Sequence, residues 1–229
     1  MCRFVQFLIA FTLAAPLHAH AARPFVTDDA RVVDEGGYQI ETFVKRQRAF
    51  KEHEFWLLAA HNPFGRVELT FGGTAMQSSL DGNSNSLIAQ AKTLLKPLER
   101  NGAGYALTLG VMRVERAPPQ PVETGPYVNA IASYSFADDS VVMHTNLGAR
   151  RDDAAGLTRG TWGIGVEIWM SERLYGIAET YGERGQQPTR HFGVRYWVVP
   201  QRVQFDGTLG IQDGNPARRF NTIGLRLLF

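Results

Sequence analysis

The C-terminal stretch 221–229 constrains the fold of this chain more than any other feature. Its apolar side chains recur at every second position, namely Ile223, Leu225, Leu227 and Phe229. This period is typical of a β-strand with one apolar and one mixed face. An apolar strand at a chain end would fray or aggregate in water unless it pairs with another strand and closes a barrel. We therefore interpret these four residues as the assembly signature of a bacterial outer-membrane β-barrel.

The first residues of the chain have the layout of a secretory signal peptide. Arg3 precedes an apolar run that extends from Phe4 to about Ala15, and Ala19-His20-Ala21 has the small-x-small pattern of a cleavage site. The run is shorter than the roughly 18 residues of a spanning helix, which disfavours the alternative of a membrane anchor. We predict that residues 1–21 are the signal peptide.

Composition narrows the class of the exported part. The only cysteine, Cys2, lies in the signal peptide, so the exported part has no disulfide. The net charge of +2 and the lack of a block rich in Lys or Arg argue against a nucleic-acid partner. No later apolar run approaches the length of a spanning helix. The chain is then either a periplasmic β-protein or an outer-membrane barrel.

Turn residues divide the rest of the chain into twelve pieces of strand length. These pieces are 38–48, 53–61, 66–77, 86–97, 103–115, 127–136, 140–150, 160–170, 173–182, 189–199, 202–212 and 219–229. Most match the roughly 9–11 residues of a tilted membrane strand, whereas strands of soluble sheets usually have about five or six. Twelve is also an even number, as in single-chain bacterial barrels. The prediction for residues 37–229 is an all-β, transmembrane, antiparallel up-and-down β-barrel of about 12 strands.

The predicted connections alternate in length. Those after even pieces are short, such as 62–65 and 137–139, and those after odd pieces tend to be longer and polar, such as 77–85 and 117–126. This sorting is typical of periplasmic turns and outer loops. We expect both ends of the barrel on the periplasmic side.

The alternation within each piece indicates which side chains face the lumen. A Lys or Arg turned to the bilayer midplane costs roughly 2–4 kcal/mol, so charged residues in mid-strand must point inward. Pieces 53–61 and 173–182 have no clear phase, although we place Glu179 inward. Aromatic residues near strand ends, including Tyr127, Tyr196 and Phe229, are expected on the lipid face as interfacial girdles. The candidates for lining the lumen or binding a solute are Glu41, Lys45, Glu68, Lys92, His144, Glu167, Glu179, His191, Arg195, Asp206 and Arg226.

These candidates favour no catalytic chemistry. The nearest approach to a Ser–His pair is Met143-His144-Thr145-Asn146, and no serine lies two residues from a strand histidine. His144 and His191 stand alone on different pieces, a poor basis for a metal site. We expect no enzyme, cofactor or metal. The inward charges either brace a narrow interior or line a solute path.

Residues 22–36 lack a strong period and precede the first piece. They form either an irregular periplasmic tail or a partial plug inside the lumen. As a plug, their acidic residues would meet inward cations such as Arg195 and Arg226, and the acidic residues are Asp28, Asp29, Asp34 and Glu35.

Three motifs in the first third of the chain carry a family resemblance. They are Arg23-Pro24-Phe25-Val26-Thr27-Asp28-Asp29-Ala30, Gly36-Gly37-Tyr38-Gln39-Ile40-Glu41 and Asn62-Pro63-Phe64-Gly65-Arg66-Val67-Glu68-Leu69. Together they resemble the outer-membrane proteins grouped under the meta-pathway of phenol degradation. The resemblance implies a porin-like transport barrel that passes small, often aromatic or hydrophobic molecules, with no catalytic residues to transfer.

The resulting functional hypothesis is a barrel that gives small molecules passive, selective passage across the bacterial cell outer membrane. Its expected partners are the lipid bilayer, the barrel-assembly machinery and a small-molecule solute. One alternative is a non-conducting structural or surface-interaction barrel whose lumen is filled by side chains. A second, less favoured alternative is a membrane-embedded hydrolase.

Overall fold

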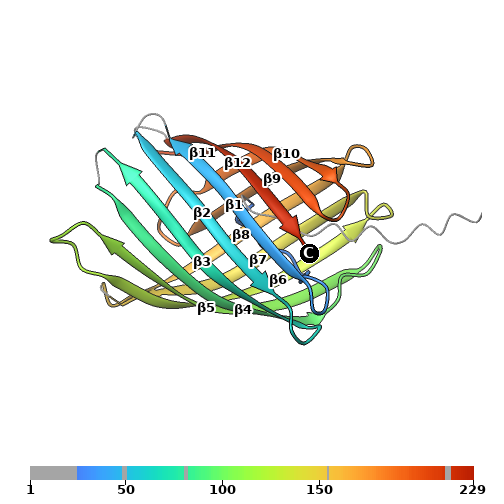
Figure 1. Cartoon of the computed structure of the whole chain (residues 1–229), viewed down its shortest axis with the longest axis horizontal. Coiled ribbons are helices and arrows are strands. Elements are labelled where there is room, and N and C mark those ends of the chain that lie inside the picture. Colours follow the sequence, from blue (N-terminus) through green and yellow to red (C-terminus); the bar gives the residue numbers. More distant parts are fainter. Residues whose placement is uncertain (1–24, 48–50, 80–81, 154, 215–217) are drawn as a thin grey trace, which may run out of the picture.

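Twelve antiparallel strands close on themselves in the computed structural model (Figure 1). The structure describes residues 25–47, 51–79, 82–153, 155–214 and 218–229, and the predicted signal peptide lies outside them. The strands are β1 (Tyr38–Gln47), β2 (Glu52–His61), β3 (Val67–Ser78), β4 (Ser84–Lys96), β5 (Ala103–Arg116), β6 (Glu123–Phe136), β7 (Val141–Asp152), β8 (Leu157–Trp169), β9 (Leu174–Glu183), β10 (Thr189–Val199), β11 (Val203–Gln212) and β12 (Arg218–Leu228). No helix in the described part of the chain is long and apolar enough to cross a membrane.

Each strand pairs with its neighbours in sequence, and β12 pairs with β1 to close the ring. The closing ladder runs from Gln39 opposite Leu228 to Arg46 opposite Asn221. Beyond it, Tyr38 and Phe229 exchange two backbone hydrogen bonds of 3.1 and 2.9 Å. The predicted fold, a transmembrane antiparallel up-and-down β-barrel of twelve strands, is confirmed.

We call the end where β1 begins and β12 ends the near end, and the opposite end the far end. The predicted difference in loop length between the two ends is wrong. Several strands extend into segments that we expected to be loops, which leaves connections such as 117–122 and 153–156 at the far end. Backbone pairing continues there because the ladder itself needs no apolar face, as in the pairing of Asp152 with Leu157.

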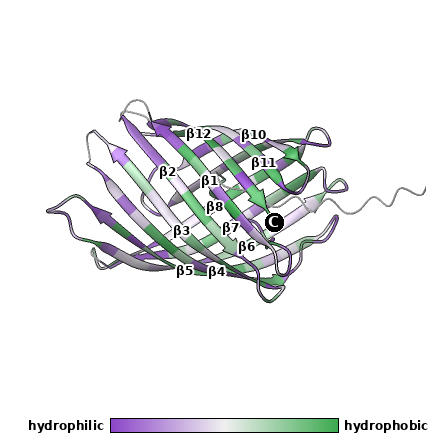
Figure 2. Cartoon of the chain, viewed as in Figure 1, coloured by the Kyte–Doolittle hydropathy of each residue, from purple (hydrophilic) through white to green (hydrophobic). Residues whose placement is uncertain are grey.

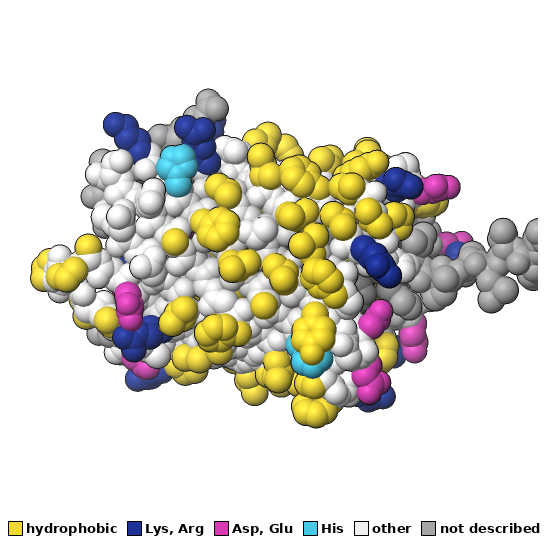
Figure 3. Space-filling view, in the orientation of Figure 1, with side chains coloured by type: hydrophobic (Ala, Val, Ile, Leu, Met, Phe, Trp, Pro, Cys, Tyr) yellow, Lys and Arg dark blue, Asp and Glu magenta, His cyan; other side chains and the backbone are white. Residues whose placement is uncertain are grey.

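The outer wall of the barrel is apolar. Side chains such as Phe192, Val194 and Leu209 are exposed on it, while charged residues gather toward the two ends (Figures 2 and 3). Such a band is what the hydrocarbon interior of a bilayer requires of the strands that cross it. The structure also gives the phase of β2, since Phe55 is exposed and Leu58 is buried in the lumen.

Tyr127 corrects one expectation about the aromatic residues. Its side chain points into the lumen, where the hydroxyl donates a 2.6 Å hydrogen bond to Oε1 of Gln90. The position opposite it is Gly110, where a Cβ atom would lie 2.5 Å from the Tyr127 oxygen. The inward aromatic ring therefore occupies space that the glycine leaves open.

Deleting Phe229 should impair closure of the barrel, because it removes both backbone hydrogen bonds to Tyr38 together with an apolar side chain of the outer wall. We expect less of the compact form that migrates faster on an unheated gel than after boiling. The substitution Phe229→Ala keeps the backbone bonds and should have a smaller effect in refolding from denaturant. Deleting Gln120, in a far-end loop, is the control. Equal yields for all three variants would contradict a role of this closure in assembly.

Candidate functional site in the barrel lumen

Residues 25–35, which we call the lumen segment, run through the interior of the barrel. The segment enters at a turn at the near end, where Gly36 has a φ of 75° and donates its N–H to the carbonyl oxygen of Asn62 at 2.8 Å. Phe25, Ala30 and Val33 are each almost fully buried. In this barrel the buried interior is therefore made in part by a piece of chain that belongs to no strand.

Wall side chains bind the main chain of the lumen segment. Glu179 on β9 accepts hydrogen bonds of 2.9 Å from the N–H of Val26 and 2.7 Å from that of Thr27. Asn146 on β7 accepts from the N–H of Asp28 and donates to its carbonyl oxygen, both at 2.8 Å. These contacts supply the partners that a buried backbone needs outside a sheet or helix.

The same pattern continues toward the near end. Ser133 on β6 accepts from the N–H of Ala30 at 2.9 Å, and Glu68 on β3 accepts from the N–H of Val33 at 2.9 Å. Asn62 donates to the carbonyl oxygen of Val33 at 2.5 Å. The segment thus crosses the lumen from the β2–β3 side to β9.

Ion pairs add to these contacts, and the expectation that the acidic residues meet inward cations holds in part. Lys92 on β4 lies 3.0 Å from Oδ1 of Asp28 and 3.7 Å from Oδ1 of Asp29. Arg31 lies 3.4 Å from carboxylate oxygens of both Asp29 and Glu167. Lys92 therefore neutralises the acidic side of the segment together with Arg195, which interacts electrostatically with Asp29, whereas Arg226 pairs with Glu41.

Two glycines of β8 give the segment its space. A Cβ atom on Gly165 would lie 2.6 Å from Cε1 of Phe25, and one on Gly163 would lie 2.7 Å from Oγ1 of Thr27. Neither contact can form without displacement of the segment. The wall of the barrel and the lumen segment are therefore fitted to each other in shape.

Arg195 is the centre of the most deeply buried charge cluster. Its guanidinium lies 2.5 Å from Oε1 of Glu167 and 3.1 Å from Oδ1 of Asp206, and the Arg195 side chain is fully buried. Gln204 donates a further hydrogen bond of 3.0 Å to Asp206. The side chains of this cluster come from three strands, β8, β10 and β11, of which β8 is separated from β10 by β9.

The remaining candidates form smaller groups. Arg226 lies 3.5 Å from Glu41 and also donates to the amide oxygen of Gln39, all three being buried. Nδ1 of His191 lies 2.7 Å from Oε1 of Glu179, the residue that binds the lumen segment. Lys45 is only half-buried and pairs with Glu54 at 2.8 Å. The structure thus places the eleven candidates on the inner side of the wall, in several groups rather than one site.

A serine–histidine contact that we did not predict occurs inside the barrel. Oγ of Ser133 lies 2.8 Å from Nδ1 of His144 across the β6–β7 pair, and Nε2 of His144 is 3.8 Å from Oε1 of Glu167. The last distance exceeds a hydrogen bond. Because Ser133 also accepts from the lumen segment and Glu167 is paired with Arg195, this arrangement serves packing and lacks the geometry of a catalytic triad.

Sequence reasoning also missed the uncharged members of the site. Asn146 and Ser133 bind the segment, yet we searched only for charged or histidine side chains. A usable signal existed, because Asn146 lies two residues from His144 and so faces the lumen with it. Within the described residues, no group of three His, Cys, Asp or Glu side chains could hold a metal ion.

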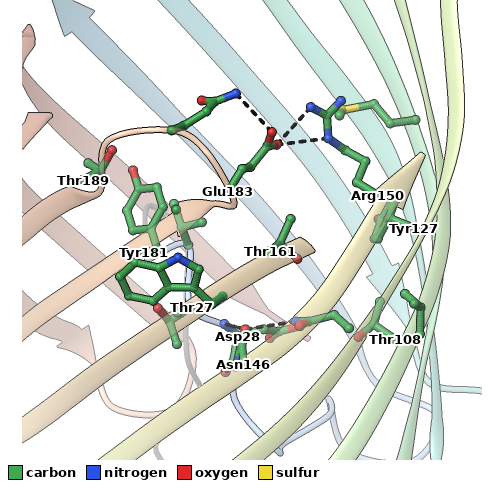
Figure 4. Close-up of a pocket in the computed structure, with 18 of the residues that line it drawn as sticks. Thr27, Asp28, Thr108, Tyr127, Asn146, Arg150, Thr161, Tyr181, Glu183 and Thr189 are labelled. Atoms are coloured by element: carbon green, nitrogen blue, oxygen red, sulfur yellow. Dashed lines mark hydrogen bonds and ion pairs between the residues drawn. The ribbon is translucent and has the colours of Figure 1, made fainter. Parts of the chain in front are cut away.

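A cavity of about 420 Å³ occupies the far half of the lumen (Figure 4). Val26, Thr27 and Asp28 of the lumen segment form its floor, and Val26 exposes its side chain to the cavity. The aromatic rings of Trp56, Tyr127 and Tyr181 contribute to the wall. Uncharged polar side chains alternate with them, including Gln90, Thr108, Asn129, Asn146, Thr161 and Thr189.

The charged wall residues of this cavity are already paired. Nη2 of Arg150 lies 2.9 Å from Oε1 of Glu183, and Gln186 donates a 3.2 Å hydrogen bond to the other carboxylate oxygen (Figure 4). The cavity therefore presents aromatic faces and amide or hydroxyl groups, with opposite charges held together at one side. Such a lining suits a small solute with an aromatic or hydrogen-bonding surface and little net charge.

Replacing Arg195 by methionine should lower the free energy of unfolding by about 3–5 kcal/mol, because Asp206 and Glu167 would stay buried without their nearest cation, and Glu167 would keep only Arg31. The control is Arg113→Met, which removes an exposed pair with Glu115 and should cost less than about 1 kcal/mol. Denaturant titration in lipid vesicles measures both values. Equal losses for the two variants would show that the buried cluster does not stabilise the barrel.

Comparison with solved structures places the fold among outer-membrane barrels. The KdgM porin in complex with disordered oligogalacturonate aligns with a TM-score of 0.63 at 10% identity, covering 82% of this chain and 98% of that one. The NanC porin gives a TM-score of 0.59 at 10% identity with the same coverage. The β domain of the Bordetella autotransporter BrkA gives 0.56 at 13% identity, covering 84% of this chain and 99% of that one. At these identities the likeness concerns the fold alone.

Sequence comparison gives one family. A family described as "Uncharacterised conserved protein UCP029691" matches residues 9–229, nearly the whole chain. No curated protein matches the sequence significantly. The solved structures support a porin-like barrel fold, and neither comparison supports the phenol meta-pathway family that the N-terminal motifs resemble.

Proposed function

The chain belongs to the UCP029691 family, and on the basis of its lumen we propose that it is an outer-membrane channel for small molecules. Passage through it is passive and selective. The lumen segment acts as a plug that closes the channel, and the far cavity is the vestibule where a solute first binds. The charged and polar wall residues form the path that opens when the plug leaves.

The observation that carries this proposal is that the lumen holds a length of backbone. A barrel of eight strands is filled by its own wall side chains, whereas a wider barrel leaves space. Here that space is occupied by residues 25–35, so their removal leaves an opening about as wide as a peptide. Polar groups and ion pairs make most of the contacts, and water can replace these when the segment withdraws.

The far cavity defines the solute class of the proposal. Its aromatic rings and amides, with Arg150 and Glu183 neutralising each other, favour small aromatic solutes with polar groups over strongly charged ones. One solved structure of the KdgM porin is a complex with disordered oligogalacturonate, so a barrel of similar fold can bind a small molecule. The preference for aromatic molecules rests on the cavity of this chain and on the family resemblance of the N-terminal motifs.

The location and the assembly partner belong to the same proposal. The apolar wall band fits the hydrocarbon layer of the outer membrane, reached after export by the predicted signal peptide. We infer that Ile223, Leu225, Leu227 and Phe229 are read by the barrel-assembly machinery during insertion. This inference is supported by the position of β12, which carries these residues and pairs with β1 to close the barrel.

One observation favours the alternative of a non-conducting structural barrel. The near half of the lumen combines the segment with the Arg195 and Arg226 clusters, both fully buried. If these wall groups close the lumen unaided, removal of the segment opens nothing. The two functions therefore differ in what happens when the segment is displaced.

Displacing the segment should raise solute flux. We expect proteoliposomes with the Gly165→Val variant, whose side chain would collide with Phe25, to take up phenylalanine several times faster than those with the wild type. A variant lacking residues 23–33 should show at least the same increase. The matched control is Gly207→Val, since a Cβ atom at Gly207 has no neighbour within 4 Å.

Uptake at the level of empty liposomes for both displaced variants, with normal gel mobility of the barrel, would reject the channel and support the structural alternative. Faster uptake by the Gly207→Val control as well would show that the effect comes from general damage to the barrel.

A further inference from the structure

The lumen segment is held in the way that binding proteins hold a peptide ligand. Wall side chains reach the main-chain atoms of residues 26, 27, 28, 30 and 33. They come from β3, β6, β7 and β9 and from Asn62 at the end of β2. These strands belong to a closed sheet, which fixes the backbone positions from which the side chains reach inward.

Main-chain contacts do not depend on which residue the segment presents. Glu179 with Thr27, Ser133 with Ala30 and Glu68 with Val33 each bind an N–H group that nearly every residue carries. Two of these acceptors are carboxylates, which form the stronger class of hydrogen bond. The wall therefore recognises an extended polypeptide backbone.

Side-chain contacts add selectivity along the same path. Gly165 leaves the recess for the ring of Phe25, and Ala30 packs against Ala106 and Ile131. Lys92 then selects acidic residues, as it does Asp28 and Asp29. The wall thus prefers an aromatic residue, then acidic residues, then a small one, in that order.

We propose that the lumen wall is a binding site for short linear peptides, which the chain's own residues 25–35 occupy in the closed state. The ligand class is an extended peptide with an aromatic residue followed by acidic residues. Such a peptide binds where the segment was and competes with its return. The inference rests on the proposed function in one respect, namely that the segment can leave the lumen. It adds to that function a peptide ligand for the site that the segment vacates.

A cleavable full-length protein tests this inference. A protease recognition sequence is inserted between Glu35 and Gly36, both exposed at the near end, and is cut after the barrel has folded in detergent. The probe is a fluorescent synthetic peptide of residues 25–35, and its anisotropy measures binding. We expect saturable binding to the cut protein, competition by unlabelled peptide, and little binding to the uncut protein.

Two N-methylated peptides distinguish recognition of the main chain from non-specific binding. An N-methyl group on Val33 removes the donor to Glu68 and should weaken binding about tenfold or more. The matched control carries the N-methyl group on Val32, whose N–H is bonded to none of the wall groups named above, and should bind nearly as tightly as the unmodified peptide. A peptide of the same composition in scrambled order should bind more weakly.

Each result of the binding experiment either supports or overturns the inference. Loss of the cut segment without rebinding of the probe, or equal weakening by both N-methyl groups, overturns the inference. Retention of the cut segment with slow replacement by the probe supports it. Uptake of phenylalanine by the cut protein is measured in parallel: flux without peptide binding rejects only the inference, and peptide binding without flux rejects only the channel.

Discussion

Closing the sheet into a barrel brings every inward side chain into one shared interior, and the charges of that interior must be neutralised there. Arg195 illustrates the constraint, because its full burial is offset by contacts with carboxylates such as Glu167 and Asp206. The rest of the lumen follows the same rule on a larger scale. Lys92 on the wall pairs with Asp28 and Asp29 of the lumen segment as well as interacting with Glu68 on the wall, so wall and segment form one electrostatic unit.

The shared contacts between wall and lumen segment bear on the proposed channel function. A channel needs a polar lining, yet a polar lining without solvent is costly, and the segment resolves the conflict by providing hydrogen-bond donors where a solute path would provide water. Glu68 and Glu179 show the substitution most directly, because backbone N–H groups occupy positions that water would take in an open lumen. The closed state is then stabilised by contacts that an entering solute or solvent can replace.

Much of the fold could be predicted from sequence because two periodic signals are local. The alternation of apolar side chains gave the strands, and the cost of a charge in lipid gave the direction of Arg195 and Arg226. Tyr127 was misplaced because an aromatic residue suits either side of a wall near its end, and only the facing Gly110 and the nearby Gln90 decide. The loop lengths were misjudged because polar residues can continue a ladder at the solvated end.

A partial plug was one of the two interpretations of residues 22–36, but most of its partners on the wall lay beyond sequence reasoning. The partners of Asp28 depend on which strands lie across the barrel, and no periodic signal contains that information. Lys92 and Asn146 are 64 and 118 residues away from Asp28, respectively. The family of the chain was equally out of reach, since the resemblance to the phenol group came from short motifs in its first third, and the family that matches is a different one.

The pairing of Gly165 with Phe25 has a consequence for the history of the sequence. The two positions share one volume although they lie on different parts of the chain, so a larger residue at one leaves less room at the other. Relatives that keep a closed lumen should therefore vary at these positions together, with a small residue at position 25 wherever position 165 carries a side chain. Relatives that have lost the segment should be free of this covariation, and under the proposed function their sequences would identify members of the family whose lumen stays open.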